Sequence, residues 1–314
     1  MIRRLIPLFF LMSLLGQEQP AGGVFRIPSK FPEEKPPAPP KPEEPKTVVL
    51  SYTGTPIKLP FSCTDDDITA FGMTCTELYP CPVYAELAGL QPLGSKIFVS
   101  GNLHNGATTM YSLLLVSEDG GKTWLEPLDR IKSAGLDKIE FFDIETGWIS
   151  GGSLLALPRD PFFLLTTDGG RNWRRRPVFG DPHVGTVDQF HFESRTAGAL
   201  IVDRGQGADL GGRFEKYETM TGGESWMVRE VSPRGMRLKI PVSASSPSDW
   251  RLGADAGEKA HLIERRIGNK WTTVAAFEVR VGSCKPTVTA LPEPILEPLA
   301  PPVATPARPG LKKR

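Results

Sequence analysis

Four arginines stand close together in one stretch of the sequence, at Arg171, Arg174, Arg175 and Arg176. Guanidinium groups pair bidentately with carboxylates and are favoured at protein interfaces. We interpret the stretch first as a solvated outer strand of a blade, on which side-chain alternation would turn Arg175 away from Arg174 and Arg176. The alternative is an anionic or protein-docking patch, for which these four arginines are the candidate binding residues.

A second group of residues has types that suit glycoside chemistry. The phrase at residues 25–28, Phe-Arg-Ile-Pro, matches one that in sialidases carries an arginine for the substrate carboxylate. Such enzymes also need further arginines, a Tyr/Glu nucleophile pair and an acidic proton donor. No phrase brings together the residues that supply these types, which are Arg195, Arg204, Arg213, Glu215 and Tyr217. We therefore expect no catalytic residues.

Neither the acidic residues nor the cysteines indicate a metal centre. The three acids of 65–67 are consecutive, so they cannot all face one ligand on a strand, and we interpret them as a polar loop. The cysteines contain no Cys-x-x-Cys pair of the kind typical of zinc sites. We expect no metal ion and no cofactor. The net charge of +1 argues against general nucleic-acid binding.

The four cysteines indicate disulfides. Cys63, Cys75 and Cys81 lie close together, whereas Cys284 lies more than 200 positions later. Behind a secretory signal, four cysteines predict two disulfides, and three pairings are possible. Every pairing that uses all four joins Cys284 to one of the early three, which would tie the two ends of the fold together. A zinc site is the alternative.

The two ends of the chain differ in composition from its middle. Arg3 and Arg4 precede a short apolar run, which predicts a signal peptide over 1–16 and a secreted or periplasmic protein without stable membrane insertion after cleavage. Retention as an uncleaved anchor is the alternative. Proline-rich composition predicts a disordered linker over 17–46 and a disordered tail over 286–314, leaving 47–285 as the folded domain.

The arginines belong to a motif that recurs through the folded domain. Its tryptophans, Trp124, Trp173, Trp226 and Trp271, are 49, 53 and 45 positions apart. Repeats of about this length are typical of propeller blades. The residues that define the four turns are Ser117, Asp119, Gly121 and Trp124; Thr166, Asp168, Gly170 and Trp173; Thr219, Gly223 and Trp226; and Gly268 and Trp271.

Each residue type in the motif has a structural reason. Glycine supplies the positive φ that a tight turn needs, and the Ser/Thr hydroxyl and Asp carboxylate accept bonds from backbone amides of the turn. The tryptophan then buries a large ring on the next strand. We interpret these residues as structural rather than catalytic or metal-binding. In the third turn Thr221 stands where the aspartate is expected.

A second pattern recurs ahead of the later tryptophan turns. It consists of a strand, an acidic turn and a short strand, and two of its copies contain Trp148 and Trp250. Together the two elements resemble the Asp-box, or BNR, repeats of sialidases and sortilin-type receptors. The combination is similar to propellers related to the photosystem II assembly factor. This resemblance covers about residues 85–277 and implies an all-β propeller that binds or assembles other proteins.

The repeats predict the number of blades. Four units are recognisable, over 85–130, 138–180, 187–232 and 238–279. Strand-like runs within 47–81, together with the C-terminal strand at 275–281, predict a fifth blade. A four-bladed or incomplete ring is the alternative. We expect almost no helix, with one short turn at most in 128–135.

The resemblance to binding and assembly propellers implies a function. We expect a non-catalytic propeller that acts, as a monomer, as a binding or complex-assembly module for a secreted or envelope protein. The alternative is a carbohydrate-active or glycan-binding propeller, either sialidase-like or lectin-like. A cluster of arginines in the central channel would favour the enzyme, and exposed aromatic residues there would favour a glycan binder.

Overall fold

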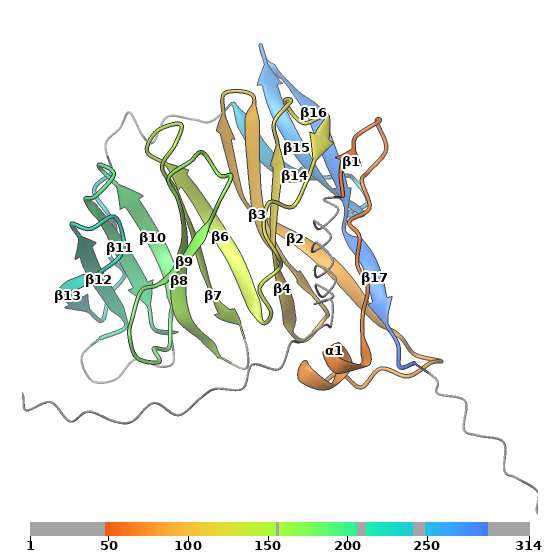
Figure 1. The fold of residues 1–314 in the computed structure, drawn as a ribbon, viewed down its shortest axis with the longest axis horizontal. Coiled ribbons are helices and arrows are strands. Elements are labelled where there is room, and N and C mark those ends of the chain that lie inside the picture. Colours follow the sequence, from red (N-terminus) through yellow and green to blue (C-terminus); the bar gives the residue numbers. More distant parts are fainter. Residues whose placement is uncertain (1–47, 155–156, 206–211, 241–248, 288–314) are drawn as a thin grey trace, which may run out of the picture. The chain divides into compact units, whose positions relative to one another are not determined.

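The computed structural model describes residues 48–154, 157–205, 212–240 and 249–287 (Figure 1). The chain divides into two compact units, Met1–Pro45 and Lys46–Arg314, and all described residues belong to the second. The predicted signal peptide, the linker, the phrase at 25–28 and the tail beyond Thr287 lie outside the described residues. Within the described residues, no helix has the length and apolar character needed to cross a membrane.

Four antiparallel sheets, numbered here as blades 1 to 4, dominate the described residues (Figure 1). Blade 1 contains β2 (Cys81–Leu93), β3 (Lys96–His104) and β4 (Thr109–Ser117), with β17 (Arg280–Cys284) beside β2. Blade 2 contains β6 (Ala134–Phe141), β7 (Gly147–Leu154), β8 (Pro158–Thr166) and β9 (Arg174–Pro177). Blade 3 contains β10 (Thr186–Phe192), β11 (Gly198–Asp203), β12 (Phe214–Thr219) and β13 (Met227–Ser232). Blade 4 contains β14 (Trp250–Ala254), β15 (Ala260–Ile267) and β16 (Lys270–Glu278). Sheets of consecutive antiparallel strands are the blades of a β-propeller, so the predicted all-β propeller fold is confirmed.

The segment expected to start a fifth blade has a different structure. Its only strand, β1 (Leu50–Ser51), pairs with the short β5 (Thr123–Trp124), and Ile57 forms a single bridge to Phe277. Prolines at 56 and 60 lack the amide hydrogen that a longer ladder would need. Of the C-terminal strand expected at 275–281, residues up to Glu278 belong to β16 of blade 4, and β17 pairs with β2 of blade 1. The β1–β5 pair is a separate two-stranded sheet, so the two ends of the folded domain do not form a fifth blade.

The one helix of the described residues lies where a polar loop was expected. Helix α1 (Asp65–Ala70) begins at a capping box, because the Thr64 hydroxyl accepts from the Asp67 amide and the Asp67 carboxylate accepts from the Thr64 amide. A Thr-x-x-Asp phrase is a helix-start signal of this kind. By contrast, residues 128–135 contain no helical turn.

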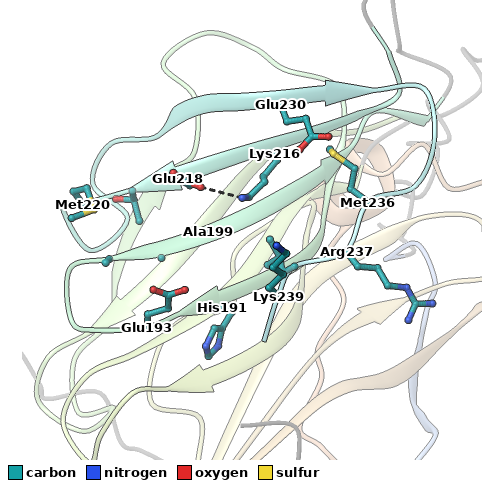
Figure 2. A pocket seen from close by; sticks show the side chains of 14 residues that line it. His191, Glu193, Ala199, Lys216, Glu218, Met220, Glu230, Met236, Arg237 and Lys239 are labelled. Atoms are coloured by element: carbon teal, nitrogen blue, oxygen red, sulfur yellow. Dashed lines mark hydrogen bonds and ion pairs between the residues drawn. The ribbon is translucent and has the colours of Figure 1, made fainter. Parts of the chain in front are cut away.

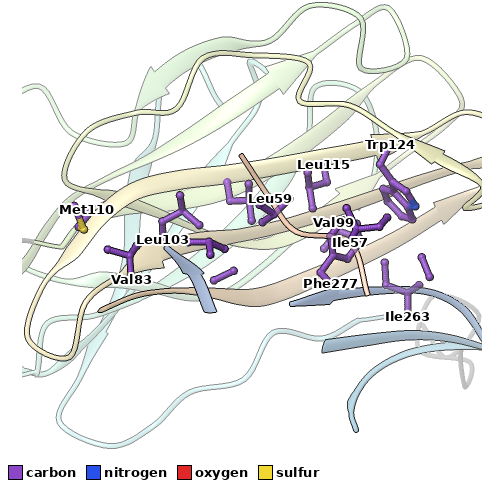
Figure 3. Close-up of a cluster of buried hydrophobic side chains, with 14 of the residues drawn as sticks. Ile57, Leu59, Val83, Val99, Leu103, Met110, Leu115, Trp124, Ile263 and Phe277 are labelled. Atoms are coloured by element: carbon purple, nitrogen blue, oxygen red, sulfur yellow. The ribbon is translucent and has the colours of Figure 1, made fainter. Parts of the chain in front are cut away.

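The hydrophobic cores lie between successive blades. The largest lies around blades 1 and 4 and includes Leu59 from the N-terminal segment, Val99 from blade 1 and Phe277 from blade 4 (Figure 3). A second joins blades 1 and 2 through side chains such as Phe98 and Phe162. A third joins blades 2 and 3. Packing of sheet faces against one another is how propeller blades bury their apolar residues.

Each of the first three tryptophan turns carries its ring to a neighbouring blade. Trp124 of blade 1 meets Phe277 of blade 4 at 5.3 Å, and Trp173 of blade 2 meets Phe98 of blade 1 at 6.1 Å between ring centroids. Trp226 meets Phe163 of blade 2 at 5.6 Å. These turns therefore hold adjacent blades together as well as closing their own hairpins.

The second glycine of the turn is required by both its conformation and its surroundings. Gly170 has φ +83°, and a Cβ there would lie 2.5 Å from the Phe98 ring of blade 1. Gly121 has φ +98°, and a Cβ there would lie 2.3 Å from Val274 of blade 4. Any larger residue would strain the turn and separate the blades.

The hydrogen bonds within the turns follow the expected pattern. Asp168 Oδ1 accepts from the amides of Arg171 and Asn172 at 3.1 and 2.9 Å, and Thr166 Oγ1 accepts from the Gly170 amide at 2.9 Å. Amide donors, led by that of Asn172, lower the pKa of Asp168 to about 2. The Thr123 amide acts in the same way on Asp119, whose pKa is also about 2.

The fourth turn differs from the other three. Gly268, with φ +61°, lies in a two-residue hairpin that joins Ile267 to Lys270. Trp271 is half-buried on the surface of its own sheet, where the Arg251 guanidinium lies 4.3 Å from its ring centroid. The shorter turn has no Ser/Thr–Asp pair to project the ring onto a neighbouring blade.

Both disulfides are present. Cys63 is bonded to Cys284 with a Cα–Cα distance of 5.2 Å, and Cys75 is bonded to Cys81 at 5.3 Å. This selects one of the three possible pairings. The Cys63–Cys284 bond joins the N-terminal segment to the end of β17, as expected for a bond that ties the ends of the fold together.

Candidate functional site

The four arginines of the predicted patch have different surroundings. Arg175 lies over the Phe162 ring at 4.1 Å, and Arg176 Nη2 donates to Glu224 Oε1 of blade 3 at 3.0 Å. Arg171 and Arg174 are exposed, and among the described residues their guanidinium groups have no partner. The structure thus divides the patch into two residues with structural contacts and two that are available to a ligand.

Three of the five residues that suit glycoside chemistry do come together. The Tyr217 hydroxyl donates to Glu215 Oε2 at 2.7 Å, and Arg204 Nη1 donates to Glu215 Oε1 at 2.9 Å. His183 Nε2 lies 3.1 Å from the same carboxylate. Burial and the bond to Glu215 raise the pKa of Tyr217 above its usual range. Burial opposes ionisation of Glu215, but the bonds from Tyr217 and Arg204 lower its pKa.

The side chains of the other two arginines of that set bind other carboxylates. Arg213 forms two hydrogen bonds with Asp203, both at 2.7 Å. Arg195 bonds Asp143 at 2.7 Å and Glu145 at 2.9 Å. The three arginines therefore bind different carboxylates of the protein itself and do not form one cluster for a substrate carboxylate.

A groove of about 510 Å³ lies on blade 3 (Figure 2). One wall is the sheet face that carries His191, Ala199, Lys216 and Glu218, whereas the opposite face of blade 3 packs in the core with blade 2. Alternation of side chains along β10, β11 and β12 produces this division. The other wall is the extended segment 236–239.

The Gln189 side chain holds that segment against blade 3. Its Nε2 donates to the Met236 carbonyl at 3.2 Å, and its Oε1 accepts from the Leu238 amide at 3.1 Å. One amide side chain thus bonds the backbone of two alternate residues, as a neighbouring strand would. The segment is kept in an extended conformation at the edge of the groove.

The groove contains charged groups of both signs. Glu218 is already neutralised, because Lys216 Nζ lies 3.0 Å from its Oε1 and Arg229 Nε lies 2.9 Å from its Oε2. The bonded Lys216 and then Arg229 lower the pKa of Glu218. In contrast, the exposed carboxylates of Glu193 and Glu230 have no partner among the described residues.

The opposite wall supplies positive charge, and one methionine lies toward each end of the groove. Arg237 and Lys239 are exposed, and no described residue pairs with their charged groups. Met220 is 67% exposed and Met236 is half-buried. Figure 2 shows Met220 and Glu193 toward one end of the groove, and Met236 and Arg237 toward the other. The groove therefore offers separate acidic, basic and adaptable apolar contacts to an extended ligand.

The described residues contain no group of three or more His, Cys, Asp or Glu side chains placed to hold a metal ion. His191 contacts blade 2 instead, with its Nδ1 2.8 Å from Glu140 Oε1. The His191 and Glu140 pair therefore links two blades at the base of the groove.

We did not predict this groove from the sequence. The signal for its second wall is the alternation of Met236, Arg237, Leu238, Lys239 and Ile240, in which the apolar residues are half-buried and the basic ones exposed. We assigned 238–279 to the fourth blade, yet β14 begins only at Trp250. A strand-like pattern indicates an extended segment, but it does not identify the sheet against which the segment lies.

Comparisons with known proteins identify no family. No protein-family model and no curated protein sequence matches the chain. Among solved structures, YCF48 bound to D1 peptide is similar over 62% of this chain and 56% of its own, with 18% identity and a TM-score of 0.35. A GH74 xyloglucanase from Xanthomonas campestris matches 58% of this chain and 28% of its own, with 15% identity and a TM-score of 0.33.

An α-L-arabinanase from Penicillium chrysogenum, complexed with arabinobiose, matches 73% of this chain and 66% of its own, with 12% identity and a TM-score of 0.32. The match thus spans about half of the YCF48 chain and less than a third of the xyloglucanase. At these identities and TM-scores, the assignment of the fold depends on the sheets of the protein itself.

Proposed function

We propose that this protein is a non-catalytic propeller that binds a segment of another protein in the groove of blade 3. The observation that carries the proposal is the pairing of two walls of opposite free charge. Glu193 and Glu230 lie on the wall formed by blade 3, and Arg237 and Lys239 lie on the wall formed by the extended segment 236–239. An extended peptide presents side chains in alternate directions, so basic and acidic residues of one ligand can meet both walls.

The apolar contacts fit the same ligand. Methionine is flexible and polarisable, and it is common at surfaces that accept varied partners. Met220 and Met236 would accept apolar side chains of the peptide at either end of the groove. Arg171 and Arg174 of blade 2 provide further contacts for acidic residues of a larger client.

The proposed client is a secreted or envelope protein. Two disulfides are typical of proteins that fold in an oxidising compartment. We propose secretion or periplasmic export of this chain, and we propose that its tryptophan turns are Asp-box repeats of the assembly-factor type. Expression with a tag at the C-terminus, followed by N-terminal sequencing of the exported form, tests export and cleavage after residue 16.

The direct test of binding is in-cell cross-linking with charge-reversal variants. Glu193→Lys combined with Glu230→Lys reverses the free acids of the groove and breaks no ion pair of the described residues. We expect a client that is captured by the wild type to be lost, by tenfold or more, from this variant.

The matched control is Asp129→Lys combined with Asp181→Lys, which makes the same change of charge at exposed positions outside the groove. It should capture the client as the wild type does. Equal capture by all three proteins, or no client at all, would contradict binding in the groove.

The hydrogen bond between Tyr217 and Glu215 favours a second candidate, a sialidase-like or other glycan-directed activity. A carboxylate next to a tyrosine hydroxyl can act as the base of a tyrosine nucleophile. Turnover of a sialoside, lost in Tyr217→Phe, would support this candidate over protein binding. A glycan panel distinguishes a lectin-like role, in which sugars bind without turnover.

A further inference from the structure

The loop between α1 and β2 exposes large apolar side chains on a fixed backbone. Leu78 is 84% exposed and Tyr79 is 79% exposed. The Cys75–Cys81 disulfide closes the loop, the Thr76 amide donates to the Tyr79 carbonyl at 3.1 Å, and the Tyr79 amide donates to Thr76 Oγ1 at 3.0 Å. The loop is thus held in a conformation that leaves both side chains in water.

A groove of about 440 Å³ lies beside this loop. Its lining is mainly apolar and includes Phe71, Met73, Pro80, Pro82 and Tyr84. We call these five residues the aromatic–proline groove, and Leu78 and Tyr79 precede its Pro80 on the exposed loop. Grooves lined by aromatic rings are the usual receptors for proline-rich segments, which enter them as preformed polyproline II helices.

The C-terminal tail leaves the fold next to this groove. Cys284, the last residue of β17, pairs directly with Cys81, which also lines the groove. Three residues later the Thr287 amide donates to Asp65 Oδ1 of α1 at 2.8 Å. The chain is therefore attached beside the groove up to the residue where the described part ends.

The tail has the composition that such a groove accepts. Residues 288–302 contain prolines at 292, 294, 298, 301 and 302, and between them lie Leu291, Ile295, Leu296 and Leu299. It also carries Glu293 and Glu297. Near the groove, Lys132 Nζ lies 5.1 Å from the centroid of the Phe71 ring and 3.5 Å from Asp67 Oδ1, and its side chain is 45% exposed.

The described chain begins at the other end of blade 1. It leads to β1, which pairs with Trp124 beyond the end of β4, whereas the groove includes Asn105–Thr108 just before β4 begins. Nine residues of β-strand separate these points by about 30 Å. A short tether raises the effective concentration of a segment to the millimolar range, which favours the tail over the linker.

We propose that the aromatic–proline groove binds the protein's own C-terminal segment, residues 291–302. Proline-rich ligands bind such grooves weakly when free. Tethering makes the binding intramolecular, so that a modest affinity keeps the groove occupied until a competing ligand displaces the tail. This contact is independent of the groove on blade 3.

Photo-cross-linking in the full chain tests the contact. The photoreactive residue p-benzoylphenylalanine replaces Tyr79, which is exposed and makes no core contact, and the same residue replaces Ile144, which is 76% exposed on blade 2, as the control. We expect cross-links from position 79 to residues 291–302 of the same molecule, and none from position 144. Cross-links only to another copy, only to residues 17–46, or to no part of the chain would overturn the proposal.

A binding measurement on full-length chains provides the second test. Pro292→Ser, Pro294→Ser and Pro298→Ser together should release the tail and open the groove. A labelled peptide of residues 288–302 should then bind this variant at least tenfold more tightly than it binds the wild-type chain. Adding Leu78→Ala and Tyr79→Ala should remove that gain. Equal binding of the peptide by wild type and proline variant, or equal binding of a peptide of residues 31–45, would contradict occupation by the tail.

Discussion

At the scale of single residues, the three complete tryptophan turns provide an internal comparison. Asp119 and Asp168 each accept two backbone amides through one carboxylate oxygen. Thr221 stands at the same position in blade 3, and its hydroxyl accepts one backbone amide, that of Ser225, at 3.0 Å. The third turn therefore lacks one backbone bond that the other two contain.

Thr221→Asp should restore that bond and stabilise the fold. A net gain of about 0.5–1.5 kcal/mol in the free energy of unfolding is expected for an added hydrogen bond. The reverse change, Asp168→Thr, should cost a similar amount. Chemical denaturation of both variants measures the effect, and a loss of stability in Thr221→Asp would show that the turns are not equivalent.

The low pKa values of Asp119 and Asp168 predict a dependence of stability on pH. Both pKa values fall from an ordinary 3.8 to about 2 in the folded protein, so folding favours the ionised form. Their contribution is complete above about pH 5 and is lost as pH falls through 4 toward 2. In Asp168→Asn the free energy of unfolding should decrease less steeply over this interval, as measured by denaturation at fixed pH. Parallel curves for the two proteins would contradict the assignment.

At the scale of elements, the tryptophans divide into two kinds. Trp173 packs against Phe98 and Phe141 from two blades and its Nε1 donates to the Gly170 carbonyl at 3.1 Å. Trp271 lies on the surface of its own sheet beside Arg251. Both rings are half-buried, so similar spacing in the sequence corresponds to different packing partners rather than to different burial.

Replacing each of these tryptophans by alanine tests the division. Trp173→Ala should lower the free energy of unfolding by about 3–5 kcal/mol, because it leaves a cavity between two blades. Trp271→Ala should cost less than about 1 kcal/mol, as is usual away from a core. Thermal and chemical denaturation give both values, and similar losses in the two variants would refute the distinction.

The arginine stretch shows the same effect of tertiary context. Pairing of β9 with β8 turns Arg175 toward Phe162, and the approach of blade 3 brings Glu224 to Arg176. Strand alternation predicted that Arg175 would leave the cluster. Arg176 instead forms an ion pair with Glu224, which lies 48 positions later. No local pattern in the sequence indicates a partner at that distance.

At the scale of the whole molecule, the two disulfides close loops of very different length. Cys63–Cys284 spans 221 positions and Cys75–Cys81 spans 6. On the chain-entropy model, these bonds restrict the unfolded chain by about 5 and about 2 kcal/mol respectively.

Cys63→Ser with Cys284→Ser should therefore destabilise the protein more than Cys75→Ser with Cys81→Ser. We expect a difference of about 3 kcal/mol in the free energy of unfolding under oxidising conditions. Because reduction removes both bonds from every protein, the variants should converge in excess reductant. A larger loss from the short-loop pair would show that native contacts, rather than loop length, dominate.

Much of the fold follows from local chemistry in the sequence. The Ser/Thr–x–Asp–x–Gly–x–x–Trp phrases specify turns whose hydrogen bonds are internal, so they form wherever the phrase occurs. Their spacing indicated blades, and the placement of Cys284 indicated that the ends would be joined. The Thr64–Asp67 capping box is equally local, and our expectation of a polar loop there was wrong because Thr64 and Asp67 cap the start of a helix.

The candidate sites needed the tertiary structure. The groove on blade 3 brings together residues from β10 to β13 and from 236–239, and the aromatic–proline groove combines residues near 71, 81 and 106. The alternation of apolar and polar residues along a strand shows on which face of a sheet a residue lies, but it does not show which segment will cover that face. The sequence alone therefore determined the repeated turns and the class of fold. Packing between distant segments decided which charges remain free and where the grooves lie.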